Sequence, residues 1–161
     1  MKTYLLIGGN LGDRQKNLEI ARTAIQAEIG KIVQASSIYE TAAWGVTDQP
    51  DFLNQALEVH TNLLPFEILD KIQQIEQQMG RVKLQKWGTR IMDIDILFYG
   101  SEIIQTQRLT IPHLGIPNRN FVLVPMQEIA AELKHPLLKK TIESISLACP
   151  DLLEVKVFEK N

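Results

Sequence analysis

The order of strand-like and helix-like segments most constrains the fold of this chain. Short apolar runs rich in strand-forming residues alternate with two longer segments in which apolar residues recur at helical spacing. A glycine follows each helical segment, as expected at helix ends, and a proline opens the second one. The predicted elements are, in order, a strand at 3–7, a helix at 13–29, strands at 32–39 and 52–61, a helix at 65–79 and a strand at 93–99. This order predicts an α+β fold of the ferredoxin-like βαββαβ type, in which helices pack on an antiparallel sheet.

The rest of the chain is predicted to form a C-terminal extension of that fold. It contains a short strand near 102–104, a proline-rich loop, helices near 122–133 and 138–147, and an edge strand at 155–158. A length of 161 residues suits one domain, and the sequence contains no internal repeat, low-complexity tract or Gly/Ser-rich linker. We therefore expect a single domain that spans residues 1–161.

Charge and composition argue against several function classes. The 17 Lys and Arg against 19 Asp and Glu give a net charge of −2, which disfavours a broad surface for nucleic acid or for acidic membranes. The apolar runs are far shorter than the roughly 20 residues that cross a bilayer. The single cysteine, Cys149, cannot form an intramolecular disulfide, and the N-terminus does not resemble a signal peptide. We expect a cytoplasmic monomer that acts on small molecules, with no nucleic-acid or membrane partner.

Two aspartates in the strand predicted at 93–99 form the strongest candidate site. Because residues two apart on a strand point to the same face, the carboxylates of Asp93 and Asp95 converge, while Ile94 and Ile96 face the opposite way. Adjacent carboxylates repel one another. A divalent cation such as Mg²⁺, which takes one or two carboxylates together with substrate phosphates, relieves that repulsion. The alternative is two scattered acids on a solvent-facing strand.

Basic residues immediately precede this acidic pair. The segment 80–90 carries no acidic residue and has a charge of +4, from Arg81, Lys83, Lys86 and Arg90. Arginine offers paired donors to phosphate oxygens, and lysine offers a compact positive charge. A basic loop beside two carboxylates suits a polyphosphate that carries its metal, although a solvated connection is the simpler alternative.

Two further motifs are candidates for phosphate or metal binding. His113 follows a proline in a loop, with Arg108 and Arg119 nearby, and it suits phosphate better than zinc because no Cys or His lies at ligand spacing. The glycine-rich stretch GGNLG at 8–12 matches neither of the common phosphate-loop patterns. It predicts a tight turn between the first strand and the first helix.

Four segments occur in an order that is typical of one enzyme family. They are GGNLG at 8–12, DQPDFLN at 48–54, WGTRIMDIDI at 87–96 and RLTIPH at 108–113. Together they resemble the 6-hydroxymethyl-7,8-dihydropterin pyrophosphokinase family of folate biosynthesis, over residues 8 to about 133. The resemblance implies a ferredoxin-like α+β fold and transfer of the β,γ-pyrophosphoryl unit of ATP to the hydroxymethyl group of the pterin, with release of AMP.

The resemblance also implies roles for individual residues. Asp93 and Asp95 would hold two Mg²⁺ ions, and Arg81 and Arg90 would engage the phosphates of ATP; these four form the implied catalytic set. The implied nucleotide-binding residues are Gln73, Glu76, Lys83, Trp87, Ile96, Arg108, Thr110, His113 and Arg119. The implied pterin-binding residues are Thr41, Ala42, Trp44, Phe52, Asn54 and Phe121, with the pterin held between two aromatic rings.

Five positions depart from the family pattern without removing a charge or a metal ligand. They are Thr89, Ala42 and Ala43, where the family commonly has proline, Phe52 in place of tyrosine, and Leu114 in place of an aromatic residue. They affect the pterin loop and adenine packing rather than the reaction. Two groups are candidates to accept the proton of the pterin hydroxyl group, namely an Asp and a metal-bound water.

Two other function classes are alternatives for a chain of this pattern. An RNA-binding module shares the βαββαβ order, but it needs stacking aromatics and a basic face, whereas this chain is 6% aromatic and carries two aspartates on the strand surface. A ligand-binding regulatory domain would leave the basic segment beside the aspartates unexplained. Formation of AMP from ATP separates the three classes.

Overall fold

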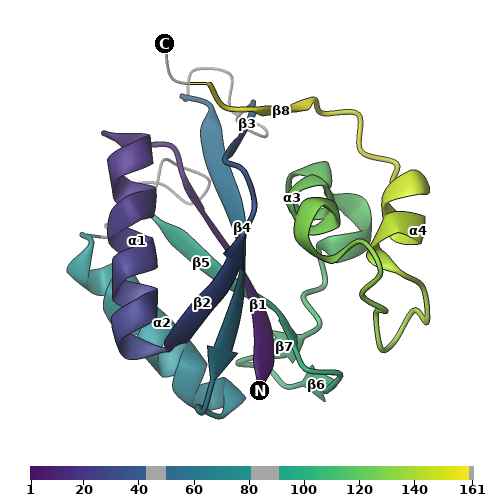
Figure 1. The fold of residues 1–161 in the computed structure, drawn as a ribbon, viewed down its shortest axis with the longest axis horizontal. Helices are drawn as coiled ribbons and strands as arrows, with labels where there is room; N and C mark the ends of the chain where they lie inside the picture. The colour runs from purple at the N-terminus through teal and green to yellow at the C-terminus, as the bar shows by residue number, and fades with distance from the viewer. Residues whose placement is uncertain (43–49, 81–90, 160–161) are drawn as a thin grey trace.

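An antiparallel sheet forms the centre of the structure, a computed structural model that describes residues 1–42, 50–80 and 91–159 (Figure 1). Its strands are β1 (Lys2–Gly9), β2 (Gly30–Ala35), β3 (Tyr39–Thr41), β4 (Phe52–Thr61), β5 (Asp93–Tyr99) and β8 (Val155–Val157). They lie in the order β5-β1-β4-β3-β8, and β2 also pairs with β4. This arrangement confirms the predicted α+β fold, and the strand order is consistent with the ferredoxin-like type.

Helices cover both faces of the sheet. They are α1 (Arg14–Glu28), α2 (Pro65–Gln78), α3 (Asn120–Ala130) and α4 (Ile142–Leu147), with a 3₁₀ turn, η1 (Ile116–Asn118), before α3. Figure 1 shows α1 and α2 on one side of the sheet and α3 and α4 on the other. A separate small sheet pairs β6 (Ile104–Gln105) with β7 (Thr110–Ile111).

The two faces bury alternate side chains of each strand. On β1, Leu5 and Ile7 pack in the core that α1 and α2 complete, whereas Tyr4 and Leu6 pack against α3 and α4. This is the period-two alternation expected of a strand that is covered on both sides. A polar side chain on such a strand must therefore face a cavity or form a hydrogen bond with a neighbouring group.

Strand β5 changes its alternation at a bulge. The register against β1 shifts by one residue, and Leu97 is the extra residue. Ile94 and Ile96 before the bulge face the α1/α2 core, as does Tyr99 after it, whereas Leu97 and Phe98 both pack toward α3 and α4. In a regular strand with the same residues, Phe98 would face the α1/α2 core and Tyr99 would face α3 and α4. The bulge reverses the facing of these two residues relative to Ile94 and Ile96.

The strand predicted at 32–39 is wrong as a single element, because it forms β2 and β3 with a break between them. Ser36 lies in the break, and its hydroxyl oxygen accepts a hydrogen bond from the backbone N–H of Ala56 at 3.0 Å. A serine side chain that bonds the neighbouring backbone competes with the regular strand ladder. Both β2 and β3 still pair with β4.

The C-terminal extension differs from the prediction in detail. The strand expected near 102–104 is β6, and β7, which pairs with it, lies in the segment expected to be a loop. The helix expected at 138–147 begins only at Ile142, because Thr141 caps it by accepting a hydrogen bond from the N–H of Ser144 at 3.2 Å. The edge strand expected at 155–158 is confirmed as β8.

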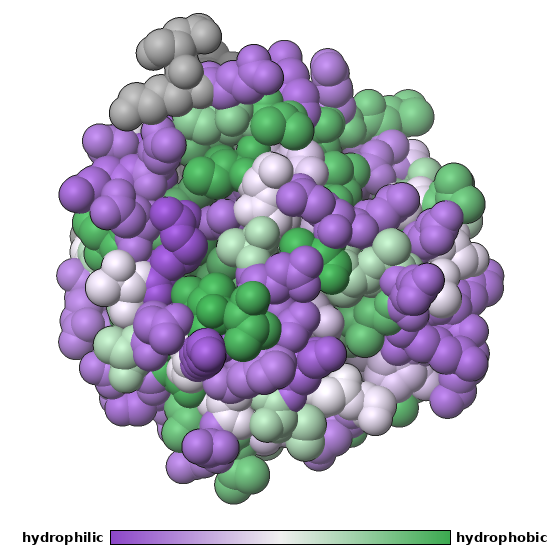
Figure 2. Space-filling model, viewed as in Figure 1, coloured by the Kyte–Doolittle hydropathy of each residue, from purple (hydrophilic) through white to green (hydrophobic). Residues whose placement is uncertain are grey.

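The surface is mixed in polarity. Figure 2 shows hydrophilic and hydrophobic side chains interspersed over the face in view. Across residues 1–42, 50–80 and 91–159, none of the helices has the length and apolar character needed to cross a membrane.

Candidate active site

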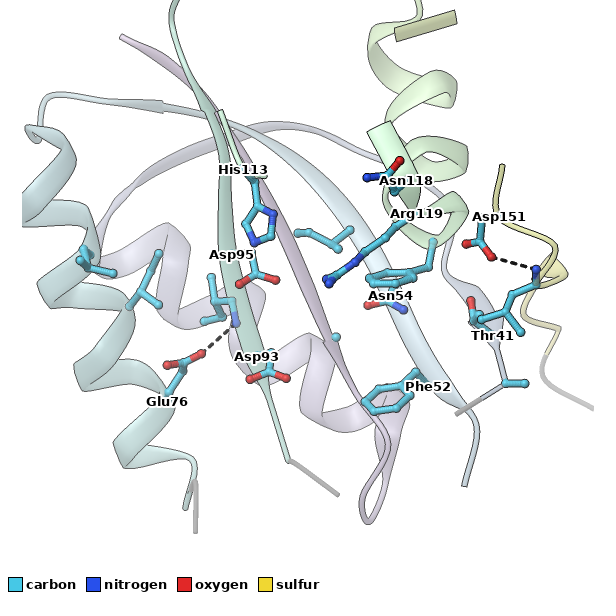
Figure 3. A pocket seen from close by; sticks show the side chains of 18 of the residues that line it. Thr41, Phe52, Asn54, Glu76, Asp93, Asp95, His113, Asn118, Arg119 and Asp151 are labelled. Carbon is cyan, nitrogen blue, oxygen red and sulfur yellow. Dashed lines mark hydrogen bonds between the residues drawn. The ribbon is translucent and has the colours of Figure 1, made fainter. Parts of the chain in front are cut away.

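A cavity of about 710 Å³ lies where several strand ends meet (Figure 3). Because the sheet is antiparallel, the ends of β1 and β3 and the starts of β4 and β5 come together at one edge. Helix α2, the first turn of α3 and the segment 151–153 complete the walls. The sequence-implied residues that line the cavity are Thr41, Ala42, Phe52, Asn54, Gln73, Glu76, Asp93, Asp95, His113, Arg119 and Phe121.

The two aspartates line the cavity from one strand face, as predicted. Asp93 and Asp95 are partly exposed there, while Ile94 and Ile96 are buried in the core beneath α1 and α2. Strand β5 is an edge strand, and Glu76 of α2 accepts a hydrogen bond from its Ile94 N–H at 2.9 Å. Glu76 is itself buried, so this bond fixes the strand between the two carboxylates.

His113 is fixed to β5 at the bulge. Its backbone N–H donates to the carbonyl oxygen of Leu97 at 3.1 Å, and its Nδ1 accepts a hydrogen bond from the N–H of Gly115 at 3.0 Å. The bulge therefore provides the carbonyl that holds the His113 loop against the cavity. With Nδ1 occupied as an acceptor, Nε2 of the neutral ring carries the proton and is the atom left to contact a ligand.

Arg119 brings positive charge to the opposite wall. Figure 3 shows its side chain extending into the cavity, across from Asp93 and Asp95. Its guanidinium carbon lies 5.7 Å from the centroid of the Phe121 ring, within the range of a cation–π contact. A Cβ added at Gly115 would lie 3.2 Å from three atoms of the Arg119 side chain, so the glycine leaves room for this arginine.

The remaining part of the cavity combines aromatic and amide groups. Phe52 and Asn54 lie at the start of β4, and Asn54 is buried. Gly8 pairs with Asn54, and a Cβ at Gly8 would come within 2.1 Å of the Asn54 Oδ1. The buried hydroxyl of Thr41 has no hydrogen-bond partner within the described part of the chain. These groups suit a flat ligand with a polar edge.

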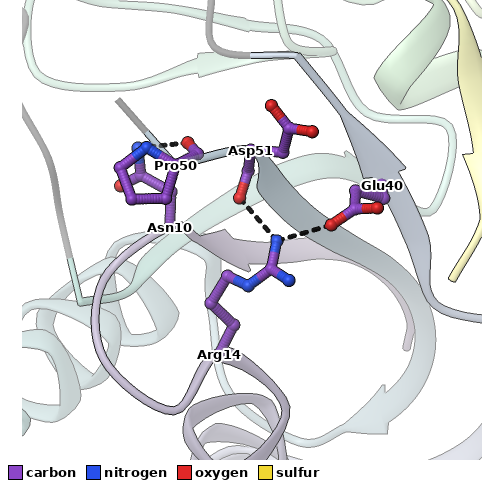
Figure 4. A network of polar contacts seen from close by, with 5 residues as sticks. All are labelled: Asn10, Arg14, Glu40, Pro50 and Asp51. Atoms are coloured by element: carbon purple, nitrogen blue, oxygen red, sulfur yellow. Dashed lines mark hydrogen bonds and ion pairs between the residues drawn. The ribbon is translucent and has the colours of Figure 1, made fainter. Parts of the chain in front are cut away.

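Figure 4 shows how the glycine-rich turn supports this wall. The turn joins β1 to α1, as predicted, with Asp13 as the helix N-cap. The amide of Asn10 donates to the Pro50 carbonyl at 3.1 Å. Arg14 donates to the Asp51 carbonyl at 2.8 Å and forms an ion pair with Glu40 at 2.7 Å. The turn and the first residue of α1 therefore anchor the residues that precede Phe52.

Three implied nucleotide-binding residues lie outside this cavity. Ile96, Arg108 and Thr110 line a second cavity of about 260 Å³, which shares Asp95 and His113 with the first. The side chain of Arg108 is half exposed and forms an ion pair with Asp70. Asp95 therefore lies on the wall that the two cavities share, and Asp93 lines the first cavity beside it.

Five implied residues lie outside the described residues: Trp44, Arg81, Lys83, Trp87 and Arg90. The basic segment, and with it Arg81 and Arg90 of the implied catalytic set, therefore has no described position. Of the residues that depart from the family pattern, Ala43 and Thr89 also lie there.

Several residues of the cavity wall were not expected from the sequence. They are Leu6, Gly8, Leu69, Ile72, Ile94, Asn118, Asp151 and Leu153. Most of the apolar residues among them lie on strands and helices that also carry residues predicted for the site. Asp151 and Leu153 belong to the C-terminal segment, and no spacing in the sequence places that segment beside α3 or β3.

The donor set fits a metal that is completed by substrate oxygens. Asp93 and Asp95 provide hard carboxylate oxygens on one face, which Mg²⁺ prefers. Within the described ranges, no three His, Cys, Asp or Glu side chains are grouped so that they could hold a metal on their own. A cation bound here would therefore need further ligands from a phosphate or from water.

Comparison with known proteins identifies relatives over most of the chain. The family model for 7,8-dihydro-6-hydroxymethylpterin-pyrophosphokinase matches residues 4–131. The chain is 46% identical over 134 residues to a 2-amino-4-hydroxy-6-hydroxymethyldihydropteridine pyrophosphokinase of Haemophilus influenzae, which covers 83% of this chain and 84% of the relative. It is 40% identical over 140 residues to the protein of the same name from Aquifex aeolicus, covering 87% of each chain.

A solved structure shares the fold. The crystal structure of Plasmodium falciparum HPPK-DHPS wild type with pteroate superposes with a TM-score of 0.77 at 19% identity. The match covers 91% of this chain and 42% of the Plasmodium chain, so this chain spans less than half of that protein. The fold, the cavity and these relatives agree, and the chain belongs to the 7,8-dihydro-6-hydroxymethylpterin-pyrophosphokinase family.

Proposed function

We propose that the chain transfers the β,γ-pyrophosphoryl group of ATP to the hydroxymethyl group of 6-hydroxymethyl-7,8-dihydropterin, giving AMP and the pterin diphosphate in folate biosynthesis. The observation that carries this proposal is the pair Asp93 and Asp95 on one face of β5: both line the first cavity with its aromatic and amide groups, and Asp95 also lines the second. Family membership supports the same reaction. The chain acts as one unit over residues 1–161, as a monomer and in the cytoplasm.

Asp93 and Asp95 hold two Mg²⁺ ions in this proposal. When bound, Mg²⁺ neutralises phosphate charge and polarises the phosphoryl group under attack. The contribution of the chain is to keep both carboxylates on one face, which the Glu76 bond to Ile94 and the β1 pairing support. Phosphoryl transfer depends mainly on such positioning and charge neutralisation, and it needs little covalent work from protein groups.

The pterin occupies the half of the cavity with Phe52, Phe121, Asn54, Thr41 and Ala42. Two aromatic rings stack on the faces of the heterocycle. Asn54 and the buried Thr41 hydroxyl then provide hydrogen bonds to its polar edge. Trp44 is proposed to join this set.

ATP occupies the other half, with its phosphates toward the aspartates. Gln73, Glu76, His113 and Arg119 line the first cavity, and Ile96, Arg108 and Thr110 line the second. Arg119 provides forked donors to phosphate oxygens, and Ile96 provides an apolar surface for the base. Arg81, Lys83, Trp87 and Arg90 are proposed to complete the nucleotide site and the charge around the transferred group.

Product identity tests this function directly. The purified chain is incubated with ATP, Mg²⁺ and 6-hydroxymethyl-7,8-dihydropterin, and the nucleotides are separated by chromatography. We expect AMP and pterin diphosphate in equal amounts, with no AMP when the pterin is omitted. Release of ADP would mean transfer of one phosphoryl group only, and absence of any turnover would favour a binding module. Sedimentation of the same sample tests the monomer.

A further inference from the structure

The C-terminal segment forms a wall of the pterin half of the cavity. Asp151 and Leu153 line it, although the family model matches only residues 4–131. This segment therefore contributes to the site from outside the part of the chain that the family model matches. The inference drawn below rests on the proposed function, because it concerns pterin binding.

Asp151 forms a clasp with the first residue of α3. One carboxylate oxygen, Oδ2, accepts a hydrogen bond from the backbone N–H of Asn120 at 2.9 Å, and the Asn120 side-chain amide donates to the Asp151 carbonyl at 3.0 Å. The other carboxylate oxygen accepts from the N–H of Leu153 at 2.9 Å. Arg119, at the N-cap position, provides no side-chain cap of its own. Asp151 thus satisfies an N–H at the start of α3 that the helix itself leaves without a partner.

The clasped residue lies between two residues of the site. Asn120 follows Arg119, whose side chain enters the cavity, and precedes Phe121, which lines the pterin half. A shift of this one backbone position therefore moves a proposed phosphate ligand and a proposed stacking ring together. Each oxygen of the Asp151 carboxylate accepts a backbone hydrogen bond, so the side chain holds the start of α3 and its own segment together.

The same segment is anchored to the sheet on its other side. Strand β8 pairs with β3, where Val155 lies opposite Thr41, and the N–H of Phe158 donates to the Ile38 carbonyl at 2.8 Å. Thr41 lines the pterin half of the cavity and carries the buried hydroxyl described above. Between its two attachments, at Asn120 and at β3, the segment joins the α3 wall to the β3 wall.

We propose that Asp151 is a positioning residue for pterin binding: by clasping the first turn of α3 to a segment that pairs with β3, it sets the spacing of Phe121 and Thr41. Arg119 is the proposed ATP ligand beside the clasp; the other described ones lie on α2, on β5 and at 108–113, and Asp151 bonds to Asn120 and Leu153 instead. Loss of the clasp therefore acts mainly on the pterin.

The test compares Asp151→Ala with Glu154→Ala, which removes the same charge from an exposed position on the same segment. We expect Asp151→Ala to raise the KM for the pterin by about tenfold, the change expected when a hydrogen bond to a charged group is lost. The KM for ATP and kcat should change by about threefold or less, which is a small change in free energy. Glu154→Ala should resemble the unmodified chain in all three constants.

Asn120→Ala removes the other half of the clasp and provides a second route to the same result. It leaves the carboxylate in place, and it should raise the KM for the pterin in the same direction but less. It decides the question if Asp151→Ala does not fold, as judged by circular dichroism.

The outcomes are distinguishable. If the unmodified chain forms no AMP, the proposed function is wrong. If it does, but neither variant changes the KM for the pterin more than Glu154→Ala does, Asp151 is not a positioning residue and the proposed function stands. Equal losses of kcat with unchanged KM values, together with a lower melting temperature, would assign Asp151 to stability alone.

Discussion

Gly8 lies where β1 approaches the Asn54 side chain most closely, and replacing it by alanine tests the pterin half of the site. The added methyl group would lie 2.1 Å from Oδ1 and 2.9 Å from Cγ of Asn54, and 2.7 Å from the Leu53 carbonyl oxygen. Ordinary van der Waals contact begins at 3.4 Å. The Asn54 side chain can rotate away, but the Leu53 carbonyl belongs to β4 and can move only with the strand.

Two effects of different size follow from this geometry. Forcing the strands apart is an overpacking change, which costs about 1–3 kcal/mol of stability. For a chain of this length each kcal/mol lowers the melting temperature by about 2–4 °C. Rotation of Asn54 would additionally remove the hydrogen bonds proposed for it with the pterin. That loss corresponds to about 1–2 kcal/mol, or a tenfold weaker pterin affinity as an order of magnitude.

Gly30→Ala is the matched control. A Cβ at Gly30 would lie 2.2 Å from the His60 carbonyl oxygen, so it strains β4 as severely as the Gly8 change does. Gly30 pairs with Thr61, seven residues along β4 from Asn54, which places it roughly 23 Å from the site. Both variants should lower the melting temperature, and only Gly8→Ala should weaken pterin binding.

Calorimetric titration of pterin into each variant, with a thermal melt of the same sample, makes the comparison. The Asn54→Ala variant should show the affinity loss without most of the stability loss. If Gly8→Ala binds the pterin as tightly as Gly30→Ala does, Gly8 is not what keeps Asn54 in place for the pterin; if Asn54→Ala binds it normally, the amide is not a pterin ligand.

Three further changes address the metal, the stacking ring and the core. Asp95→Ala should lower kcat on the order of a thousandfold with little change in melting temperature, because it removes a proposed metal ligand from a partly exposed strand face; normal turnover of this variant, measured across a Mg²⁺ titration, would exclude a metal role. Phe121→Ala should weaken pterin binding about tenfold while ATP-analogue binding stays unchanged, because stacking adds to burial; calorimetry that gives the reverse order would refute the assignment. Burial lowers the pKa of His135 below 6.5. As the pH falls through 6.5 the unfolded chain therefore binds a proton that the folded chain does not, and the free energy of unfolding decreases until the pH reaches the folded pKa. Urea titrations should show a flatter pH dependence in His135→Gln, and an unchanged slope would contradict this origin.

Regular elements were predictable because their pattern is local. The strand expected at 52–61 is β4 with the same bounds, since its alternation and flanking residues lie within the segment itself. The helix after Gly12 begins at Arg14, because Asp13 is a good N-cap. The facing of Asp93 and Asp95 follows from period-two alternation alone.

Features that depend on distant partners were not predictable in the same way. The break at Ser36 requires the Ala56 N–H as a partner, and the β6/β7 pair is only two residues long on each side. Asp151 enters the site because the chain returns along β3 after α4, which no short-range pattern encodes. The residue roles implied by the family resemblance stay predictions until variants are assayed.

Because of the bulge at Leu97, the packing of β5 depends on the number of its residues as well as on their identity. A substitution at this position alters one side chain, whereas deletion of a single codon there would restore regular alternation. The residues on either side would keep their present faces, but the buried Leu97 side chain and the Leu97 carbonyl that holds His113 would both be lost. Exchange of Leu97 for another apolar residue of similar volume keeps the backbone carbonyl and should be tolerated, whereas deletion of the residue removes it and should not be. Deep mutational scanning that includes single-residue deletions would measure that asymmetry.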